Sequence, residues 1–176
     1  MPTLEELRRQ ILFDGLSDEE LSKLVGVLEE RVYKEGEMIF SEGDDTSGLY
    51  MVRSGEVELT RSLPIDLKTK MLITVRNVHN CCEIRKTPRG WKQVLSNLIE
   101  GQFFGEFSVT EGRTKHSTNA EALENTGVLL LRKETFFEIE KSEPKTTLKM
   151  HKNIARITSK SIRLIDRQLL KLIMGI

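Results

Sequence analysis

The feature of this sequence that most restricts its possible fold is a series of short apolar segments between residues 31 and 60. From Arg31 onward the hydrophobic pattern has a period of two. Three sequences rich in turn-forming residues separate the segments: Glu35-Gly36, Glu42-Gly43-Asp44-Asp45 and Arg53-Ser54-Gly55. Short strands at such regular spacing predict a β-barrel or jelly roll rather than a parallel sheet.

Helices are expected on both sides of these strands. Thr3-x-x-Glu6 and Ser17-x-x-Glu20 are capping boxes, and apolar residues follow each of them at helical spacing. Residues 134–141 predict a short helix, and Pro144 is placed to begin a long helix. The predicted fold class is therefore mainly β with flanking helices: a barrel with N-terminal helices over residues 1–143 and a long C-terminal helix over residues 144–176.

Composition excludes several classes of protein. The chain has 176 residues and no formal net charge, which suits one domain with an appended element. Cys81 and Cys82 are its only cysteines, so no disulfide framework is available and a reducing compartment is favoured. The acidic N-terminus has no signal-peptide core, and no apolar run reaches membrane-spanning length. We therefore expect a cytoplasmic protein with no membrane contact.

No chemistry of catalysis or metal binding is visible in the sequence. The three histidines, His79, His116 and His151, are scattered, and the neighbouring cysteines lack metal-ligand spacing. A P-loop, a dinucleotide glycine fingerprint and a G-x-S-x-G motif are all missing from the sequence. The sequence thus predicts neither an enzyme nor a resident metal or cofactor.

Positive charge is concentrated in two segments. Residues 61–92 carry 8 basic and 2 acidic side chains, and residues 145–176 carry 8 and 1. Such segments can bind nucleic acid or an acidic partner, but we favour pairing with acidic segments within a dimer. Residues 61–92 are interpreted as an inserted basic β-arm, with a strand over residues 71–78 and a hairpin turn at Thr87-Pro88-Arg89-Gly90. Trp91 among these cations suits base stacking, although packing or partner contact is the preferred interpretation.

The stretch over residues 99–122 contains the candidate site. An apolar run ends at Phe103-Phe104, and Gly105, Glu106 and a polar loop with basic residues follow. Backbone N–H groups and cations in such a loop can hold a phosphate, and a lone acid can accept hydrogen bonds from sugar hydroxyls. The alternative is an ordinary Gly-Glu turn without any ligand.

Phe104-Gly105-Glu106, followed by Ser108 and Val109, resembles the phosphate-binding cassette of cyclic nucleotide-binding domains. The segment from His116 to Ala122 resembles the second half of that cassette. Ile39, Gly43-Asp44, the tetrad at residues 49–52 and Gly55 match the family's first motif, from which Phe40 and Thr46 depart. In the cassette, His116 stands where the family has the arginine that pairs with the cyclic phosphate, and Thr118 stands where it has alanine.

The resemblance implies a role for each matching residue. Gly105 would offer its backbone, Glu106 would accept the ribose 2′-hydroxyl, and Ser117 would meet the phosphate. Neutral imidazole cannot form arginine's bidentate fork, so Arg113 or Lys115 would have to compensate. The candidate ligand-binding residues are Phe104, Gly105, Glu106, Phe107, Arg113, Lys115, His116, Ser117, Thr118 and, for the base edge, Thr158.

The C-terminal segment has two apolar stripes. Leu148, Ala155, Ile162 and Leu169 repeat every seven residues, as do His151, Thr158, Ile165 and Leu172, which predicts a dimer seam. Met150, Ile154, Ile157 and Leu164 form a second stripe suited to packing on the barrel. This arrangement resembles the long helix of bacterial cyclic nucleotide-responsive regulators and predicts a parallel homodimer.

Two functions of different class remain open. The first is a stand-alone regulatory domain that senses cyclic AMP or cyclic GMP and signals through an unidentified effector protein. The second is a degenerate cyclic nucleotide-binding fold that acts as a dimeric interaction module without nucleotide. Because no helix-turn-helix follows residue 172 in this sequence, nucleic acid is not an expected partner.

Overall fold

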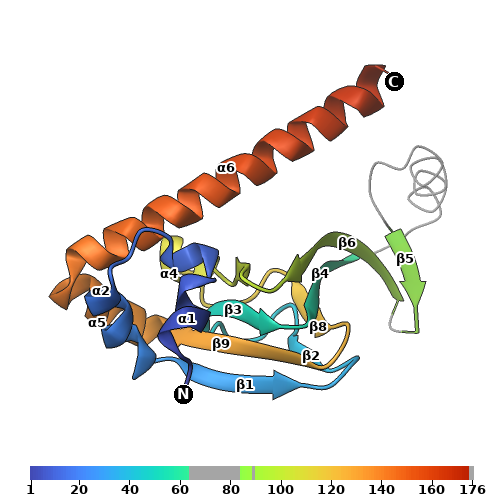
Figure 1. Cartoon of the computed structure of the whole chain (residues 1–176). Helices are drawn as coiled ribbons and strands as arrows, with labels where there is room; N and C mark the ends of the chain where they lie inside the picture. The colour runs from blue at the N-terminus through green and yellow to red at the C-terminus, as the bar shows by residue number, and fades with distance from the viewer. Residues whose placement is uncertain (64–83, 89, 175–176) are drawn as a thin grey trace.

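The computed structural model, which describes residues 1–63, 84–88 and 90–174, confirms the mainly β architecture (Figure 1). Within these residues the strands form two antiparallel sheets. The four-stranded sheet has the order β1 (Glu29–Tyr33), β9 (Thr126–Arg132), β3 (Gly48–Ser54) and β7 (Phe103–Phe104). The five-stranded sheet has the order β2 (Met38–Phe40), β8 (Asn119–Ala122), β4 (Glu56–Leu63), β6 (Gly90–Ile99) and β5 (Ile84–Thr87).

Strands β3 and β9 are buried on both faces. Along β3, Leu49 and Met51 join a core that includes the helices, whereas Tyr50 and Val52 join the core that also contains side chains of the other sheet. Residues 128–131 of β9 alternate between the same two cores. Because side chains of a strand point alternately to its two faces, a strand covered on both faces is apolar throughout. This explains the unbroken apolar tetrad at residues 49–52.

The N-terminal helices begin at the predicted capping boxes. They are α1 (Leu4–Arg8), the 3₁₀ helix η1 (Ile11–Phe13) and α2 (Asp18–Val25). Thr3 and Ser17 each accept a hydrogen bond from the backbone of the third helical residue, whose glutamate side chain accepts one in return. Helix α2 ends earlier than its apolar pattern suggests, because Leu28, although buried, lies just before β1.

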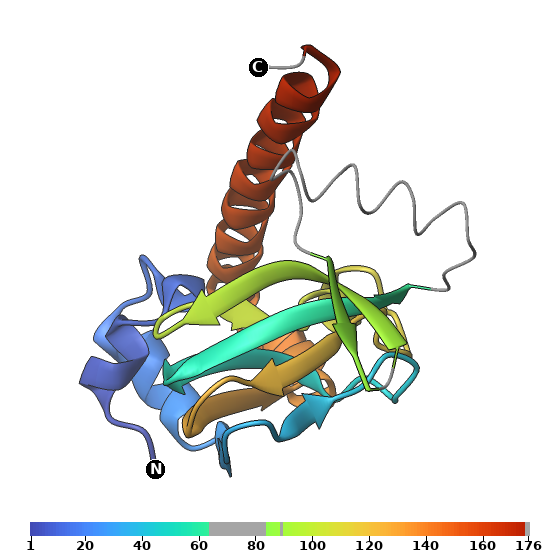
Figure 2. The same ribbon diagram turned by 90° about the vertical axis from the view of Figure 1, so that its right-hand side faces the viewer.

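Two helices follow the last strand, α5 (Lys133–Ser142) and α6 (Pro144–Met174). The predicted barrel-facing stripe of α6 is confirmed for Met150, Ile154 and Ile157, which pack in the helix-side core. Figure 2 shows that α6 rises away from the sheets toward its C-terminal end. Among the described residues, no helix has the combination of length and apolar character that crossing a membrane requires.

Polar contacts fix the first half of α6 against the N-terminal helices. The buried Asn153 Nδ2 donates to the carbonyl oxygens of Leu12 and Asp14, at 3.0 and 2.8 Å. The ammonium of Lys149 lies 2.6 Å from a carboxylate oxygen of Glu20, on α2. This hydrogen bond, together with that from the Ser17 backbone, lowers the pKa of Glu20 to about 2. Helix α6 is therefore tied to α2 by a carboxylate that stays ionised well into the acidic range.

The predicted hairpin turn is present as the connection between β5 and β6, where Thr87 pairs with Gly90. The remainder of the basic β-arm differs from the prediction at its base. Strands β4 and β6 pair from Glu56↔Ile99 to Leu63↔Trp91, with one register shift between Leu59 and Thr60, so residues 61–63 and 90–92 extend the sheet. The strand predicted over residues 71–78, with Cys81, Cys82 and Arg89, lies outside the described residues.

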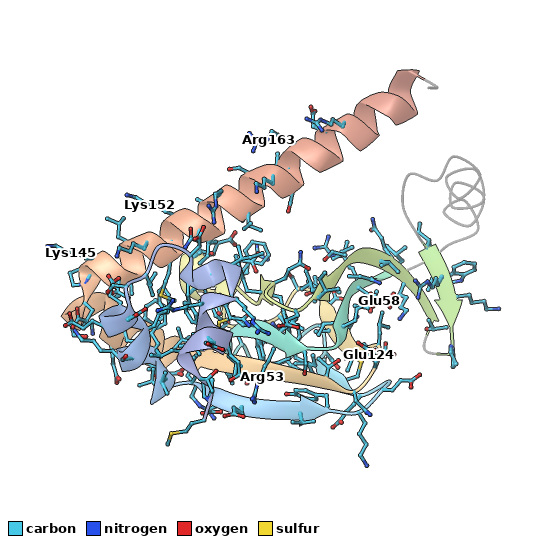
Figure 3. All side chains as sticks on the ribbon, in the orientation of Figure 1. Arg53, Glu58, Glu124, Lys145, Lys152 and Arg163 are labelled. Atoms are coloured by element: carbon cyan, nitrogen blue, oxygen red, sulfur yellow. The ribbon has the colours of Figure 1, made fainter. Side chains whose placement is uncertain are left out.

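A buried carboxylate explains part of the hairpin's positive charge. Glu58 of β4 is fully buried beside the hairpin (Figure 3), and the Nζ atom of Lys92 donates to it at 2.6 Å. Arg85 Nη1 lies 2.9 Å from its second oxygen, as an ion pair. Lys92 also lies 3.4 Å from Glu121 of β8. These hairpin cations therefore neutralise acids of their own chain, whereas the sequence interpretation placed such pairing within a dimer.

Candidate functional site

The turn after β7 brings the predicted site together. Gly105 has a φ of +80°, and a Cβ atom there would lie 2.6 Å from the carbonyl oxygen of Gly48 and 3.1 Å from the Tyr50 ring. Only glycine combines this backbone conformation with so close an approach. The turn leads into α4 (Phe107–Thr110), a short helix that the sequence interpretation did not include, with Glu106 at its N-cap position.

The loop after α4 is fastened to the turn between β2 and β3. Thr46 donates from its hydroxyl to the carbonyl oxygen of Arg113 at 2.7 Å, and from its backbone to that of Thr114 at 2.9 Å. The backbone N–H of His116 donates to Asp44, and its carbonyl accepts from Gly43. The side chain of Thr46 is thus a structural anchor, although this residue departs from the family's pattern.

His116 lies flat against Phe40. The two ring centroids are 3.5 Å apart with an interplanar angle of 6°, and only 7% of His116 is exposed. Burial lowers the pKa of His116 below its usual value of 6.5; nearby Asp44 opposes this shift and Lys133 adds to it. Nε2 is buried and has no hydrogen-bond partner among the described residues. At pH 7 this side chain therefore presents a neutral aromatic ring rather than a cation.

Glu106 is a half-buried acid beside this ring. Burial raises its pKa above the usual 4.5, its own backbone N–H opposes the shift, and Glu111 adds to it. No other described residue forms a side-chain hydrogen bond or ion pair with the Glu106 carboxylate. Beyond its own backbone N–H, this carboxylate has acceptor capacity that hydroxyl groups of a ligand would fill.

These groups line one cavity of about 300 Å³. It collects the candidate residues of the cassette: Phe104, Gly105, Glu106, Phe107, Arg113, Lys115, His116, Ser117 and Thr118. Thr158, half-buried on α6, is not among its lining residues in the described part of the chain. The structure thus brings all the predicted ligand-binding residues together at this cavity except Thr158.

Several lining residues were missed by the sequence interpretation. They are Phe40, Thr46, Leu59, Arg61, Leu95 and Ser108. Two of them could have been predicted as a pair from the sequence. Side chains of a strand alternate between its two faces, so Leu59 and Arg61 of β4 lie on the same face. The intervening Thr60 and Ser62 line a second cavity of about 350 Å³, together with Trp91, Lys92 and Glu121. Strand β4 therefore separates two cavities, and only one contains the cassette.

Each basic residue of the loop has an acidic neighbour. Arg113 Nε lies 2.5 Å from a carboxylate oxygen of Glu111, and its guanidinium lies 5.2 Å from the centre of the Phe107 ring. Lys115 lies 2.8 Å from Asp45. All four members of these ion pairs are exposed, and exposed pairs are weak enough to exchange for a ligand anion. Within the described residues, no group of three potential ligands could hold a metal ion.

Comparison with known proteins shows which families this chain is similar to. A family model described as the cyclic nucleotide-binding domain matches residues 30–73. The chain is 28% identical over 158 residues to a cyclic AMP receptor protein of Thermus thermophilus, covering 90% of this chain and 60% of that protein. It is 27% identical over 111 residues to a cAMP-dependent protein kinase regulatory subunit of Mycosarcoma maydis, covering 63% of this chain and 16% of that one.

A solved structure shares the fold as well. The crystal structure of the Thermus thermophilus catabolite activator protein matches with a TM-score of 0.66 and 27% identity, covering 93% of this chain and 63% of that one. The chain therefore spans less than two thirds of each of these relatives. In sequence and in fold, this chain is therefore similar to cyclic nucleotide-binding domains, and to the bacterial cyclic AMP receptor proteins among them.

Proposed function

We propose that this chain is a regulatory domain that binds cyclic AMP or cyclic GMP and transmits the binding event to a partner protein. The observation that carries the proposal is the cavity in which Glu106, Ser117 and Gly105 meet. Two relatives support it, since they are described as a cyclic AMP receptor protein and a cAMP-dependent protein kinase regulatory subunit. The adjacent Cys81 and Cys82 favour a reducing compartment for this function.

In this proposal different residues of the cavity contact different parts of the nucleotide. The carboxylate of Glu106 accepts a hydrogen bond from the ribose 2′-hydroxyl, and Ser117 donates one to the cyclic phosphate. Phe104 and the stacked ring of His116 supply apolar and aromatic surface, and Thr118 adds a hydroxyl at the wall. Thr158, which lies on α6 outside the cavity lining, would reach a base only after α6 moves toward the site.

The signal would pass through the packing of α6. Met150 and Ile154 join the helix-side core, to which Leu49 and Met51 of β3 also belong, while Tyr50 of the same strand faces the cavity side. A ligand that changes the position of β3 or α4 would therefore act on the surface that holds α6. Any such effect requires the ligand to bind the two helix positions with different affinity.

Replacement of Glu106 with alanine tests the proposed ribose contact. We expect the wild-type chain to bind cyclic AMP or cyclic GMP, and Glu106→Ala to bind about tenfold more weakly, because the buried hydroxyl loses a charged acceptor. Isothermal titration calorimetry measures both. Glu124→Ala is the matched control, since Glu124 is exposed and lies outside the cavity lining. No heat from the wild type with either nucleotide at millimolar concentration would refute the sensor proposal and favour the interaction module.

The proposal also includes a homodimer through α6. Leu148 and Ile162, two members of the predicted seam, are 53% and 61% exposed in the single chain, which leaves apolar surface for a second copy. We expect Ile162→Glu to shift the chain to monomer, because the dimer would bury an unpaired charge. Sedimentation equilibrium at tens of micromolar measures the shift, with exposed Lys152→Glu as the control on the same helix. A wild-type chain already monomeric at that concentration would contradict the dimer.

A further inference from the structure

The pairing of β4 with β8 places Arg61 next to the end of the cassette. In the antiparallel register Leu59 pairs with Ala120 and Thr60 with Asn119, and one further step in the same register, beyond this last pair, places Arg61 opposite Thr118. Residues directly opposite on adjacent strands have Cβ atoms roughly 4.5–5.5 Å apart. The two segments stay close beyond the last pair, because the Asn119 Nδ2 atom lies 3.4 Å from the Ser62 hydroxyl oxygen.

Alternation along β4 turns Arg61 toward the cavity. Leu59 and Arg61 line the cavity of the cassette, and Thr60 and Ser62 line the cavity on the other side. The residues just before β8, His116, Ser117 and Thr118, line the same cavity as Arg61. The Arg61 side chain and the His116 ring therefore belong to the same wall of one cavity.

Arg61 is also the lining cation for which the described residues provide no acidic partner. Arg113 pairs with Glu111 and Lys115 with Asp45. Among the described residues, no acid lies within ion-pair distance of Arg61 and no side-chain hydrogen bond fixes it, while His116 is neutral. A guanidinium beside a cavity is well suited to a phosphate, because its planar fork can donate two parallel hydrogen bonds.

We infer that Arg61 supplies the positive charge that binds the ligand's phosphate in this chain. The inference rests on the proposed function and names the ligand group: the single negative charge of a cyclic phosphodiester. Arg61 reaches that group from the strand beside the cassette, Ser117 completes its hydrogen bonds, and His116 packs beside it as an uncharged ring.

The first test removes the charge from Arg61. We expect Arg61→Ala to weaken binding of cyclic AMP or cyclic GMP about 10- to 100-fold in calorimetry, as loss of a charge-assisted hydrogen-bonded pair does. Arg61→Lys should keep an intermediate affinity, because lysine retains the charge without the fork. The exposed Lys145→Ala, at the start of α6, is the control for loss of one positive charge elsewhere. Because Arg61 is exposed, thermal unfolding of each variant should match the wild type.

The second test moves the positive charge from position 61 to position 116 of the same cavity. The double variant Arg61→Ala/His116→Arg should recover most of the affinity lost in Arg61→Ala, since the guanidinium is returned to the same cavity from the neighbouring chain segment. Wild-type binding with no loss in Arg61→Ala would overturn the role of Arg61 and leave the proposed function intact. A wild type that binds neither cyclic nucleotide would overturn the proposed function and, with it, this inference.

Discussion

Replacement of Gly105 with alanine is expected to remove ligand binding and to lower the free energy of unfolding by about 3 kcal/mol. Left-handed backbone costs a residue with a Cβ atom roughly 1–2 kcal/mol. The new methyl group would also lie 2.6 Å from the Gly48 carbonyl oxygen, where only backbone movement can relieve the clash. That movement would displace β7 from β3 and carry Glu106 out of the cavity.

Gly112, in the loop after α4, provides a matched control. Its φ of +63° is also left-handed, but an added Cβ atom would meet nothing within 4 Å. Gly112→Ala should therefore lower the free energy of unfolding only by the cost of the left-handed backbone, about 1 kcal/mol, and should leave the ligand affinity unchanged. Urea unfolding and calorimetry on both variants separate the two contributions. Equal losses in the two variants would show that the close approach to Gly48 has no energetic importance.

Replacement of Lys92 with methionine is expected to lower the free energy of unfolding by about 3 kcal/mol. The reason is Glu58, whose carboxylate would stay fully buried after losing its hydrogen bond from Lys92. Removal of one partner from a buried ion pair costs about 3–5 kcal/mol, and the remaining contact with Arg85 places the value at the lower end. Urea unfolding at pH 7 measures the change.

The double variant Glu58→Met/Lys92→Met identifies the cause. Replacement of both partners by apolar residues of similar size is often close to neutral, so most of the lost stability should return. The exposed Lys86→Met, on β5 of the same hairpin, is the control and should change stability little. If the double variant is no more stable than Lys92→Met, the loss comes from packing of the lysine stem and not from the uncompensated carboxylate.

The sequence was informative wherever local chemistry determines structure. Both capping boxes begin helices, and the turn at Thr87 and Gly90 forms a hairpin, because side chains a few residues apart decide these features. That Gly105 and Glu106 lie together at one cavity was also predictable, since the two residues are neighbours in the chain. Such motifs need no knowledge of which strands become neighbours.

Contacts between distant segments were not predictable in the same way. The position of Arg61 beside Thr118 depends on the register of β4 with β8, and the stacking of His116 on Phe40 depends on the turn anchored by Thr46. Burial of Glu58 likewise requires the hairpin to lie over β4. Each involves residues far apart in sequence, for which a single chain offers no pairing signal.

Burial of β3 and β9 on both faces has a consequence for how such a domain can diverge. Even-numbered positions of these strands face the core between the sheets, and odd-numbered positions such as Leu49 and Leu131 hold the helices, apart from local irregularities. A substitution at one of these positions therefore changes side-chain packing directly in one core, and reaches the other core only if the strand itself moves. The core side chains that line the cavity, Phe40, Leu59 and Phe104, all belong to the core between the sheets, so the cavity lining can change in composition without removing a side chain that holds the helices.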